Sequence, residues 1–286
     1  MTRVLSALVL LSVVIGAIWF LPPVATLLLA LVAAILAFRE YCAIARALGV
    51  WVPGGIGGTA VVLAGYAMWL GDRMSDGRAT MLAPAGAPSF TPNVSLEPNL
   101  AGIVMLSAFL VVAALSVARG QPGPGVLADA AATVFAPVYL GLPLGALAWV
   151  RVVSGREAVV LLLCVIVISD SAQYYTGRAF GKRPLAPTIS PKKTLEGAIG
   201  GMVFGTLAMA VGGAWVFQSP LWLLALLGAA VSLLGIVGDL FESLLKRSAG
   251  LKDSSNLIPG HGGVLDRIDS WLFAAPVYYT FVRFLA

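Results

Sequence analysis

Long apolar runs separated by short polar segments dominate this chain. Nine runs have about the 17 to 25 residues that a helix needs to cross a bilayer core. They lie near residues 4–21, 24–38, 51–70, 101–118, 128–150, 157–176, 195–217, 221–242 and 269–285. A soluble domain of this size could not bury so much apolar surface. The pattern therefore predicts an all-α, polytopic transmembrane bundle of about nine spans.

Composition agrees with a membrane protein, since 59% of the residues are hydrophobic and only 11% are charged. The first run could be a signal peptide, but it continues through Pro22 and Pro23 into a second run without a small-residue cleavage pattern. We therefore expect a retained first span. Cys42 and Cys164 lie far apart in or beside apolar runs, which indicates neither a disulfide framework nor a metal motif.

The formal charge of +5 could suggest a nucleic-acid partner, but the distribution of the basic residues favours a membrane orientation. With the N-terminus inside, the predicted cytoplasmic segments hold 13 of the 18 basic residues. These are Arg3, Arg39, Arg46, Arg119, Arg178, Lys182, Arg183, Lys192, Lys193, Lys246, Arg247, Lys252 and Arg267. We therefore expect no nucleic-acid partner, and an outward-facing C-terminus.

The chain divides by its polar chemistry into N-terminal helices, 1–150, and a C-terminal region, 151–286. In the first part, residues 71–99 are rich in Gly, Pro, Ser and Ala and predict an outer loop. In the second part, two polar loops at 177–194 and 243–268 flank two predicted spans, which returns both loops to one membrane face. A shared site formed by the C-terminal helices and cytoplasmic loops is therefore possible.

Between these loops, Gly197, Gly201 and Gly205 form consecutive GxxxG steps. Small residues at this spacing let another helix approach closely. Packing within one subunit and a dimer seam both explain the pattern.

The first loop has the composition of a polyphosphate-binding segment. Asp170 ends an apolar run, where a carboxylate needs a partner or water. Basic residues, glycines and hydroxyls follow it, and such groups bind phosphate oxygens. The segment is not a P-loop, because Arg183 stands where Ser or Thr is required. The candidate substrate-binding residues are Asp170, Arg178, Lys182, Ser190, Lys192, Lys193, Thr194 and Glu196.

Simpler roles would also explain parts of this loop. Its basic residues could belong to a solvated positive-inside loop, and Asp170 could be an interfacial carboxylate. Thr194 is placed to cap the following helix, whereas Glu196, only two residues later, does not complete a capping box.

The eighth predicted span ends in the sequence GDLFESLLKR, which places Asp239, Glu242, Ser243 and Lys246 on one helix face. An ion pair between Glu242 and Lys246 would support the helix end. Asp239 has no basic residue three or four positions later, so a cation from solution is a reasonable partner for it.

The second loop contains the only histidine, His261, among Gly260, Gly262 and Gly263. Glycines let a backbone close tightly on a ligand. Asp266 and Asp269 follow three residues apart, and capping of the last helix explains one of them but hardly both. Oxygen-rich sites of this kind select hard cations, so we expect Mg²⁺, with a second cation as an alternative.

The segment SLLKRSAGLKDSSNLIPGHGGVLDRID, from Ser243 to Asp269, resembles the signature of phosphatidate cytidylyltransferases, also called CDP-diacylglycerol synthases. The upstream sequences SDSAQYYTGRAFGKRPLAPTISPKKTLEG and GDLFESLLKR are also similar to that family. The N-terminal half resembles it only in hydrophobic character.

The resemblance implies that phosphatidate attacks the α-phosphate of CTP, which gives CDP-diacylglycerol and pyrophosphate. It also implies a metal-dependent homodimer in the cell inner membrane, with its active site facing the cytoplasm. Asp239 and Asp266 match the metal-binding pair, and the matching phosphate contacts are Lys192, Lys193, Lys246, Arg247 and Lys252. The catalytic candidates are thus Asp239, Lys246, Arg247, His261, Asp266 and Asp269, and Lys252, Asp253 and Arg267 join the substrate-binding candidates. His261 could assist proton transfer or orient a phosphate.

Three other functions remain as alternatives. A secondary transporter would place carboxylates near mid-span in both halves, yet the first half has almost none, and Glu40 lies at the end of a span. A CTP-dependent lipid kinase would yield CDP and a phosphorylated lipid. A cytidylyltransferase for a different lipid phosphate would yield a different activated lipid.

Overall fold

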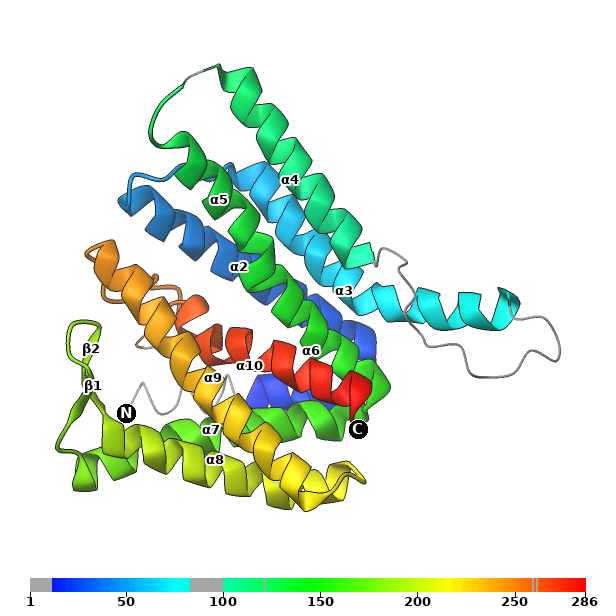
Figure 1. Cartoon of the computed structure of the whole chain (residues 1–286), viewed down its shortest axis with the longest axis vertical. Coiled ribbons are helices and arrows are strands. Elements are labelled where there is room, and N and C mark those ends of the chain that lie inside the picture. Colours follow the sequence, from blue (N-terminus) through cyan, green and yellow to red (C-terminus); the bar gives the residue numbers. More distant parts are fainter. Residues whose placement is uncertain (1–11, 83–99, 121, 259, 261) are drawn as a thin grey trace.

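A computed structural model describes residues 12–82, 100–120, 122–258, 260 and 262–286, with the backbone alone at 71–82. The first part of the predicted span at 4–21 lies outside the described residues, and its described part is helical at 12–20. Figure 1 shows the helices packed into one bundle, with a small hairpin at one end.

Helices form nearly all of the described chain, in agreement with the predicted all-α class. The N-terminal helices are α2 (Pro23–Ala47), α3 (Gly54–Leu82), α4 (Leu100–Arg119), α5 (Val126–Ala136), the π-helix η1 (Pro137–Gly141) and α6 (Leu142–Val153). The C-terminal elements are α7 (Gly155–Phe180), β1 (Pro184–Ala186), β2 (Ser190–Thr194), α8 (Leu195–Val216), α9 (Leu221–Ser248) and α10 (Leu265–Phe284). Because α3 continues to Leu82, the first part of the predicted 71–99 loop is helical.

Six helices in the described part of the chain are long and apolar enough to cross a membrane. They are Pro23–Ala47, Leu100–Arg119, Val126–Val153, Gly155–Phe180, Leu195–Val216 and Leu221–Ser248. The apolar part of α3, Gly54–Leu70, is shorter, and α10 is not among the six. The chain is therefore an integral membrane protein with a helical bundle, and the total of nine spans stays a prediction.

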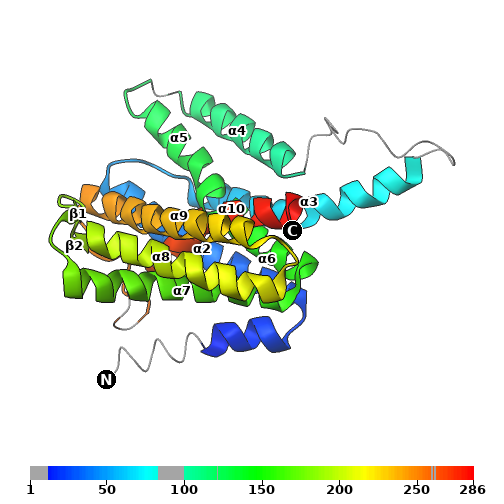
Figure 2. The ribbon, with the colours of Figure 1, turned by 60° about the horizontal axis from the view of Figure 1, so that its bottom comes forward.

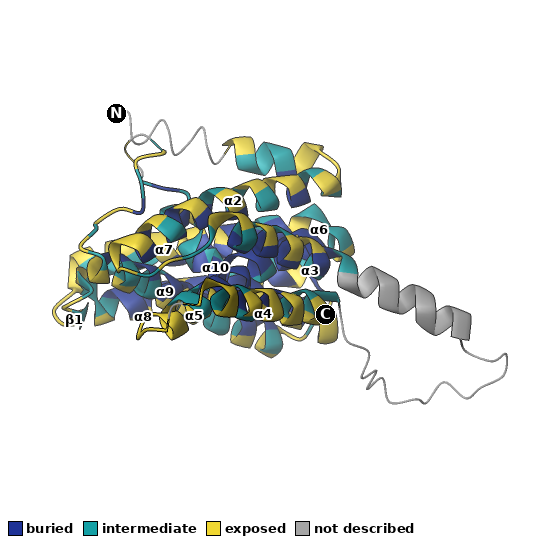
Figure 3. Cartoon of the chain, turned by 90° about the horizontal axis from the view of Figure 1, so that it is seen from above, coloured by how far each residue is buried: buried dark blue, intermediate teal, exposed yellow. Residues whose placement is uncertain are grey.

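Helix α10 forms the centre of the bundle. It packs against α9, α6 and α2, and its buried residues include Tyr278, whose hydroxyl donates to the Ala158 carbonyl at 2.7 Å. Figure 3 shows buried residues concentrated on the inner helices, whereas α4 and α8 carry many exposed positions. Figure 2 shows α4 and α5 on one side of the layer formed by α7, α8 and α9. The polar first turn of α10 is consequently surrounded by several other helices.

The glycine steps of α8 pack inside the subunit. A Cβ added to Gly197 would lie 2.7 Å from the Gln173 carbonyl oxygen, and one added to Gly201 would lie 3.0 Å from the Ser169 carbonyl oxygen. Both carbonyls belong to α7, so the close approach is between α7 and α8 of one chain. Of the two explanations for the GxxxG pattern, intrasubunit packing accounts for this face.

The segment expected to be a loop at 177–194 contains regular structure. Helix α7 continues to Phe180, and β1 and β2 then form an antiparallel hairpin that leads directly into α8. The predicted helix cap is confirmed, because the Thr194 hydroxyl accepts a hydrogen bond from the Gly197 amide at 3.2 Å. The hairpin is thus fixed to the start of α8.

Replacing Thr194 with alanine should lower the melting temperature of the purified protein, because the first turn of α8 loses its side-chain acceptor. Loss of such a cap costs about 1 kcal/mol. Thr194→Ser keeps the hydroxyl and should melt close to wild type. Equal melting temperatures for Thr194→Ala and wild type would show that the hydroxyl adds no stability.

Candidate active site

The two polar segments of the C-terminal region meet at one end of the bundle, where α7 and α9 end and α8 and α10 begin. We refer to this as the site end. There, Lys193 of β2 forms an ion pair with Asp239 of α9. Arg247 Nε, near the end of α9, donates to the Ile189 carbonyl beside β2 at 3.4 Å. The predicted convergence of the two segments is therefore present in the fold.

Asp239 has a basic partner that the sequence did not predict, and the expected cation stays a prediction. Its own helix has no basic residue three or four positions later, but the hairpin places the Lys193 ammonium against Asp239 Oδ2. The Ser243 hydroxyl lies 3.4 Å from Asp239 Oδ1 and can donate to it. Spacing along one helix could not reveal a partner that arrives from 46 residues away.

Two further acids interact electrostatically with this ion pair. Asp170 of α7 interacts electrostatically with Asp239 and Lys193, and Asp269 of α10 interacts with Asp239, Asp170 and Lys193. The Ser270 amide donates to Asp269 at 2.7 Å. Carboxylates from three helices therefore share the field of one lysine, which gives this region a negative charge excess when all of them are ionised.

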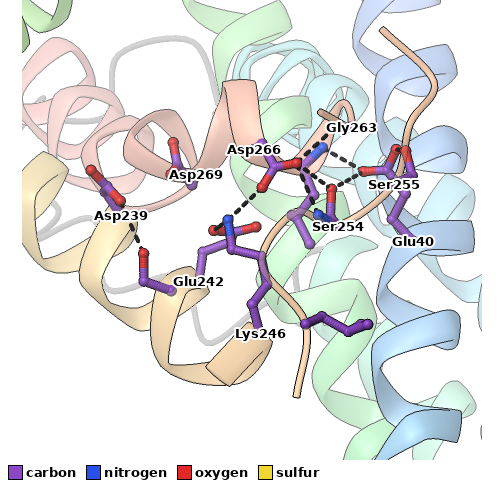
Figure 4. Close-up of polar contacts among 12 residues, drawn as sticks. Glu40, Asp239, Glu242, Lys246, Ser254, Ser255, Gly263, Asp266 and Asp269 are labelled. Atoms are coloured by element: carbon purple, nitrogen blue, oxygen red, sulfur yellow. Dashed lines mark hydrogen bonds and ion pairs between the residues drawn. The ribbon is translucent and has the colours of Figure 1, made fainter. Parts of the chain in front are cut away.

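A second ionic network joins α9 to α10. The Lys246 ammonium forms ion pairs with both Glu242 and Asp266, so the predicted pair of Glu242 and Lys246 is present. The exposed fractions of these side chains are 10% for Lys246, 0% for Glu242 and 6% for Asp266. Because buried charges require partners, the two carboxylates stabilise the charged form of this lysine. Figure 4 shows the three side chains converging.

The second carboxylate oxygen of Asp266 holds the loop between α9 and α10. Asp266 Oδ2 accepts hydrogen bonds from the Gly263 amide at 2.7 Å, the Ser254 amide at 3.0 Å and the Ser254 hydroxyl at 2.8 Å. One carboxylate thus fixes both the lysine of α9 and the loop that carries much of the signature-like sequence. Any group bound by Lys246 would be positioned relative to that loop.

Glu40 of α2, which the sequence did not single out as a site residue, reaches the same loop. Glu40 Oε1 accepts from the Ser255 hydroxyl at 2.7 Å and the Val264 amide at 3.0 Å. Its Oε2 accepts from the Leu265 amide at 2.7 Å and lies 2.9 Å from the Ser254 hydroxyl. Figure 4 shows Glu40 opposite Asp266 across this loop. The only signal in the sequence was an acid at the end of an apolar segment, next to Arg39.

The Glu40 side chain also stabilises the start of α10. Glu40 is only 5% exposed, and its carboxylate accepts hydrogen bonds from the amides of Val264 and Leu265 at the amino end of that helix. A carboxylate is favourable there because helix amides point outward and the helix dipole is positive at that end. The N-terminal half of the chain therefore helps to shape the site.

Gly263 has no room for a side chain in this arrangement. A Cβ at this position would overlap the Ser254 hydroxyl and both oxygens of Glu40. Gly263→Ala should therefore displace the loop and reduce any activity that depends on Asp266 by at least about tenfold. Gly123→Ala is the control, since nothing lies within 4 Å of its added Cβ. Unchanged turnover in Gly263→Ala would show that the loop geometry is not needed.

The other predicted site residues also belong to the segments that meet at the site end. Arg178 donates to the Tyr174 hydroxyl at 3.4 Å, and Arg247 donates to the Leu251 carbonyl at 2.9 Å. Glu196 accepts the amides of Lys182 and Arg183, which gives it a structural role in the hairpin. The exposed candidates are Lys182, Lys192, Lys252, Asp253 and Arg267, and Ser190 is partly buried. His261 lies outside the described residues.

The donor chemistry of this region suits a hard cation, although the described side chains do not form a complete metal site. No group of three or more His, Cys, Asp or Glu in the described part of the chain is arranged to hold a metal. Asp239 and Asp266 are each paired with a lysine. Mg²⁺ sites commonly use only one or two carboxylates and complete their shell with substrate phosphates and water. The residues therefore fit Mg²⁺ only together with a phosphate ligand.

A model of the cytidylyltransferase family matches residues 1–285. The chain is 46% identical over 134 residues to a phosphatidate cytidylyltransferase of Synechocystis sp., covering 46% of this chain and 45% of that protein. It is 50% identical over 123 residues to one from Pseudomonas aeruginosa, covering 41% and 45%. It is 41% identical over 159 residues to one from Mycobacterium tuberculosis, covering 54% and 48%. The chain thus spans about half the length of these curated relatives.

Proposed function

Because this chain belongs to the cytidylyltransferase family, we propose that it transfers CMP from CTP to phosphatidate, giving CDP-diacylglycerol and pyrophosphate. Curated relatives named phosphatidate cytidylyltransferase support the choice of substrates. The reaction belongs to phospholipid biosynthesis, and the chain is an enzyme of the nucleotidyltransferase class.

The observation that carries this proposal is the arrangement of Lys193 and Lys246, each held by carboxylates at the site end. Both substrates are phosphates that carry negative charge, so their mutual repulsion is the main obstacle to reaction. Lysines bind phosphate oxygens through charge-assisted hydrogen bonds. A substrate phosphate can therefore replace Asp239 or Asp266 as the partner of a lysine, which leaves a carboxylate available at the site.

The chemistry requires no nucleophilic side chain. An oxygen of the phosphatidate phosphate attacks the α-phosphorus of CTP, a new phosphorus–oxygen bond forms, and the bond to the β-phosphate breaks. Pyrophosphate leaves with the electron pair of that bond. Since the attacking oxygen is already anionic, the protein contributes mainly position and positive charge, here from Lys193, Lys246 and Arg247.

Mg²⁺ is the proposed cofactor, and Asp239 and Asp266 would hold it together with the substrate phosphates. When bound, such an ion neutralises phosphate charge and stabilises the leaving pyrophosphate. Asp269 and Asp170 place an excess of carboxyl groups close to Asp239, and a cation bound in this region would favour their ionised forms. A second cation is compatible with that excess of carboxylates.

The proposed location is the cell inner membrane, with the site end facing the cytoplasm, where CTP is available. The concentration of basic residues in the hairpin and in the loop after α9 supports this orientation. A site at the membrane surface lets the acyl chains of phosphatidate stay in lipid while CTP arrives from water. The family resemblance supports a homodimer.

One assay tests the reaction. Purified protein in phosphatidylcholine vesicles with phosphatidate receives Mg²⁺ and CTP labelled at the α-phosphate. We expect labelled lipid and pyrophosphate in equal amounts. CDP with a phosphorylated lipid would instead identify a CTP-dependent lipid kinase. Labelled product from another lipid phosphate, and none from phosphatidate, would identify a different acceptor.

A further inference from the structure

A groove of about 720 Å³ runs between α2 and α3, away from the candidate catalytic residues. One face of α2 lines it with Ile35, Phe38, Arg39, Cys42 and Arg46, at helical spacing. The facing surface is the first part of α3, from Gly54 to Leu63. None of the residues assigned to the two ionic networks contributes to this lining.

The polarity of the groove changes along its length. Arg46 lies in the last turn of α2, opposite the glycines that begin α3, whereas Ile35 and Leu63 lie farther into the two helices. The exposed fractions of Ile35 and Leu63 are 42% and 47%. A groove with a basic end and an apolar end matches a molecule that has an anionic head and hydrocarbon chains.

The basic end of the groove can bind an anion. Within the described part of the chain, the guanidinium groups of Arg39 and Arg46 form no hydrogen bond or ion pair. The amides of Gly54 and Gly55 begin α3, where helix amides lack partners inside the helix. Nothing lies within 4 Å of a Cβ added at either glycine, so an oxygen atom can approach this backbone closely. Two guanidinium groups and a helix start therefore present positive charge to one space.

We propose that the groove between α2 and α3 binds an anionic membrane phospholipid. Its phosphate lies between Arg39, Arg46 and the start of α3, and an acyl chain follows Ile35 and Leu63 toward the membrane interior. The site is distinct from the one proposed for phosphatidate, and the inference does not depend on the proposed reaction.

The position of this groove connects it to the candidate active site through one helix. Arg39 faces the groove, and the next residue, Glu40, holds the loop before α10. A lipid that orders this part of α2 would also order Glu40. Binding in the groove therefore favours the loop geometry seen here.

Native mass spectrometry of the full-length protein can test the proposal with phosphatidylglycerol, an anionic lipid that is neither substrate nor product of the proposed reaction. Phosphatidylcholine is the zwitterionic comparison. We expect wild type to prefer phosphatidylglycerol, and Arg39→Ala/Arg46→Ala to bind it at least about tenfold more weakly. Arg39→Lys/Arg46→Lys should retain part of the preference. Arg151→Ala/Arg156→Ala is the control. It removes two arginines where α6 ends and α7 begins, outside the groove, and should bind phosphatidylglycerol as wild type does.

Gly55→Phe separates the groove from general surface charge, because it keeps both arginines and fills open space in the lining. We expect this variant to lose phosphatidylglycerol binding while its melting temperature stays near wild type. Wild-type binding in Gly55→Phe, or in the double alanine variant, would overturn the proposal. A change of oligomeric mass without a change in bound lipid would also overturn it and assign the groove to contact between protein copies.

Discussion

Asp266→Asn should reduce CMP transfer by at least about a hundredfold, a loss typical of removing one charged group from a preorganised site. In the wild type, one oxygen of Asp266 meets the Lys246 ammonium and the other accepts from Gly263 and Ser254. Asparagine has only one acceptor oxygen. Its amide group must therefore face either the ammonium or the loop donors, and both arrangements place donor against donor.

The charge change adds to this effect. Without the negative charge of Asp266, Lys246 keeps only Glu242 as an anionic partner in its network. The variant also loses one of the two carboxylates proposed to hold Mg²⁺. Initial rates of labelled CDP-diacylglycerol formation, measured over a range of Mg²⁺ concentrations, will report both losses.

Asp129→Asn provides a matched control outside the site. Asp129 also accepts a backbone amide, from Trp51 at 2.8 Å, and also faces a base, Arg119, at 3.8 Å. The same chemical change there should alter turnover by no more than about twofold, because the carboxylate contacts none of the proposed phosphate ligands. Full turnover in a correctly folded Asp266→Asn protein would remove Asp266 from the proposed machinery.

Local sequence pattern was sufficient for the features that depend on neighbouring residues. Apolar runs located the helices, since a span is defined by its own composition. The Glu242 and Lys246 pair followed from helical spacing, and the Thr194 cap followed from its position before α8. The family signature between Ser243 and Asp269 directed attention to the segment that carries Lys246 and Asp266.

Contacts between distant segments could not be predicted from local sequence pattern. Lys193 and Asp239 meet because the hairpin brings β2 to the end of α9. The sequence predicted only a loop at 177–194, and a loop gives no register for that contact. For this reason the sequence suggested only a cation from solution as the partner of Asp239, and it did not indicate Lys193. The predicted division at residue 150 likewise gave no reason to connect α2 with the loop before α10.

Glu40 shows the same limit more clearly. Its carboxylate bonds to residues more than 200 positions later, and no spacing rule connects those segments. From the sequence, the position of Glu40 at the end of an apolar span argues only against a transporter, which would place acids near mid-span. The structure shows why the acid is tolerated there, because the Ser255 hydroxyl and the amides of Val264 and Leu265 donate to its two oxygens.

Glu40→Ala should therefore impair both the loop and the activity, although Glu40 is proposed to touch neither substrate. The change leaves the amides of Val264 and Leu265 and the hydroxyl of Ser255 without their acceptor. Each buried donor left unpaired costs about 1–3 kcal/mol unless water enters the space. We expect a lower melting temperature, faster amide hydrogen exchange at 254–265, and at least about a tenfold loss of kcat from the displaced Asp266.

Two further variants separate this positioning role from a general loss of stability. Glu40→Gln keeps one acceptor oxygen, so its hydrogen exchange and kcat should lie between those of Glu40→Ala and wild type. Glu157→Ala removes an acid whose side chain is 51% exposed near the other end of α7 and should change neither quantity. If Glu40→Ala melts earlier but keeps wild-type kcat and wild-type exchange at 254–265, Glu40 does not position the loop.

Because a positioning residue acts through Asp266, Glu40→Ala should also add little to the loss of kcat already caused by Asp266→Asn when the two changes are combined.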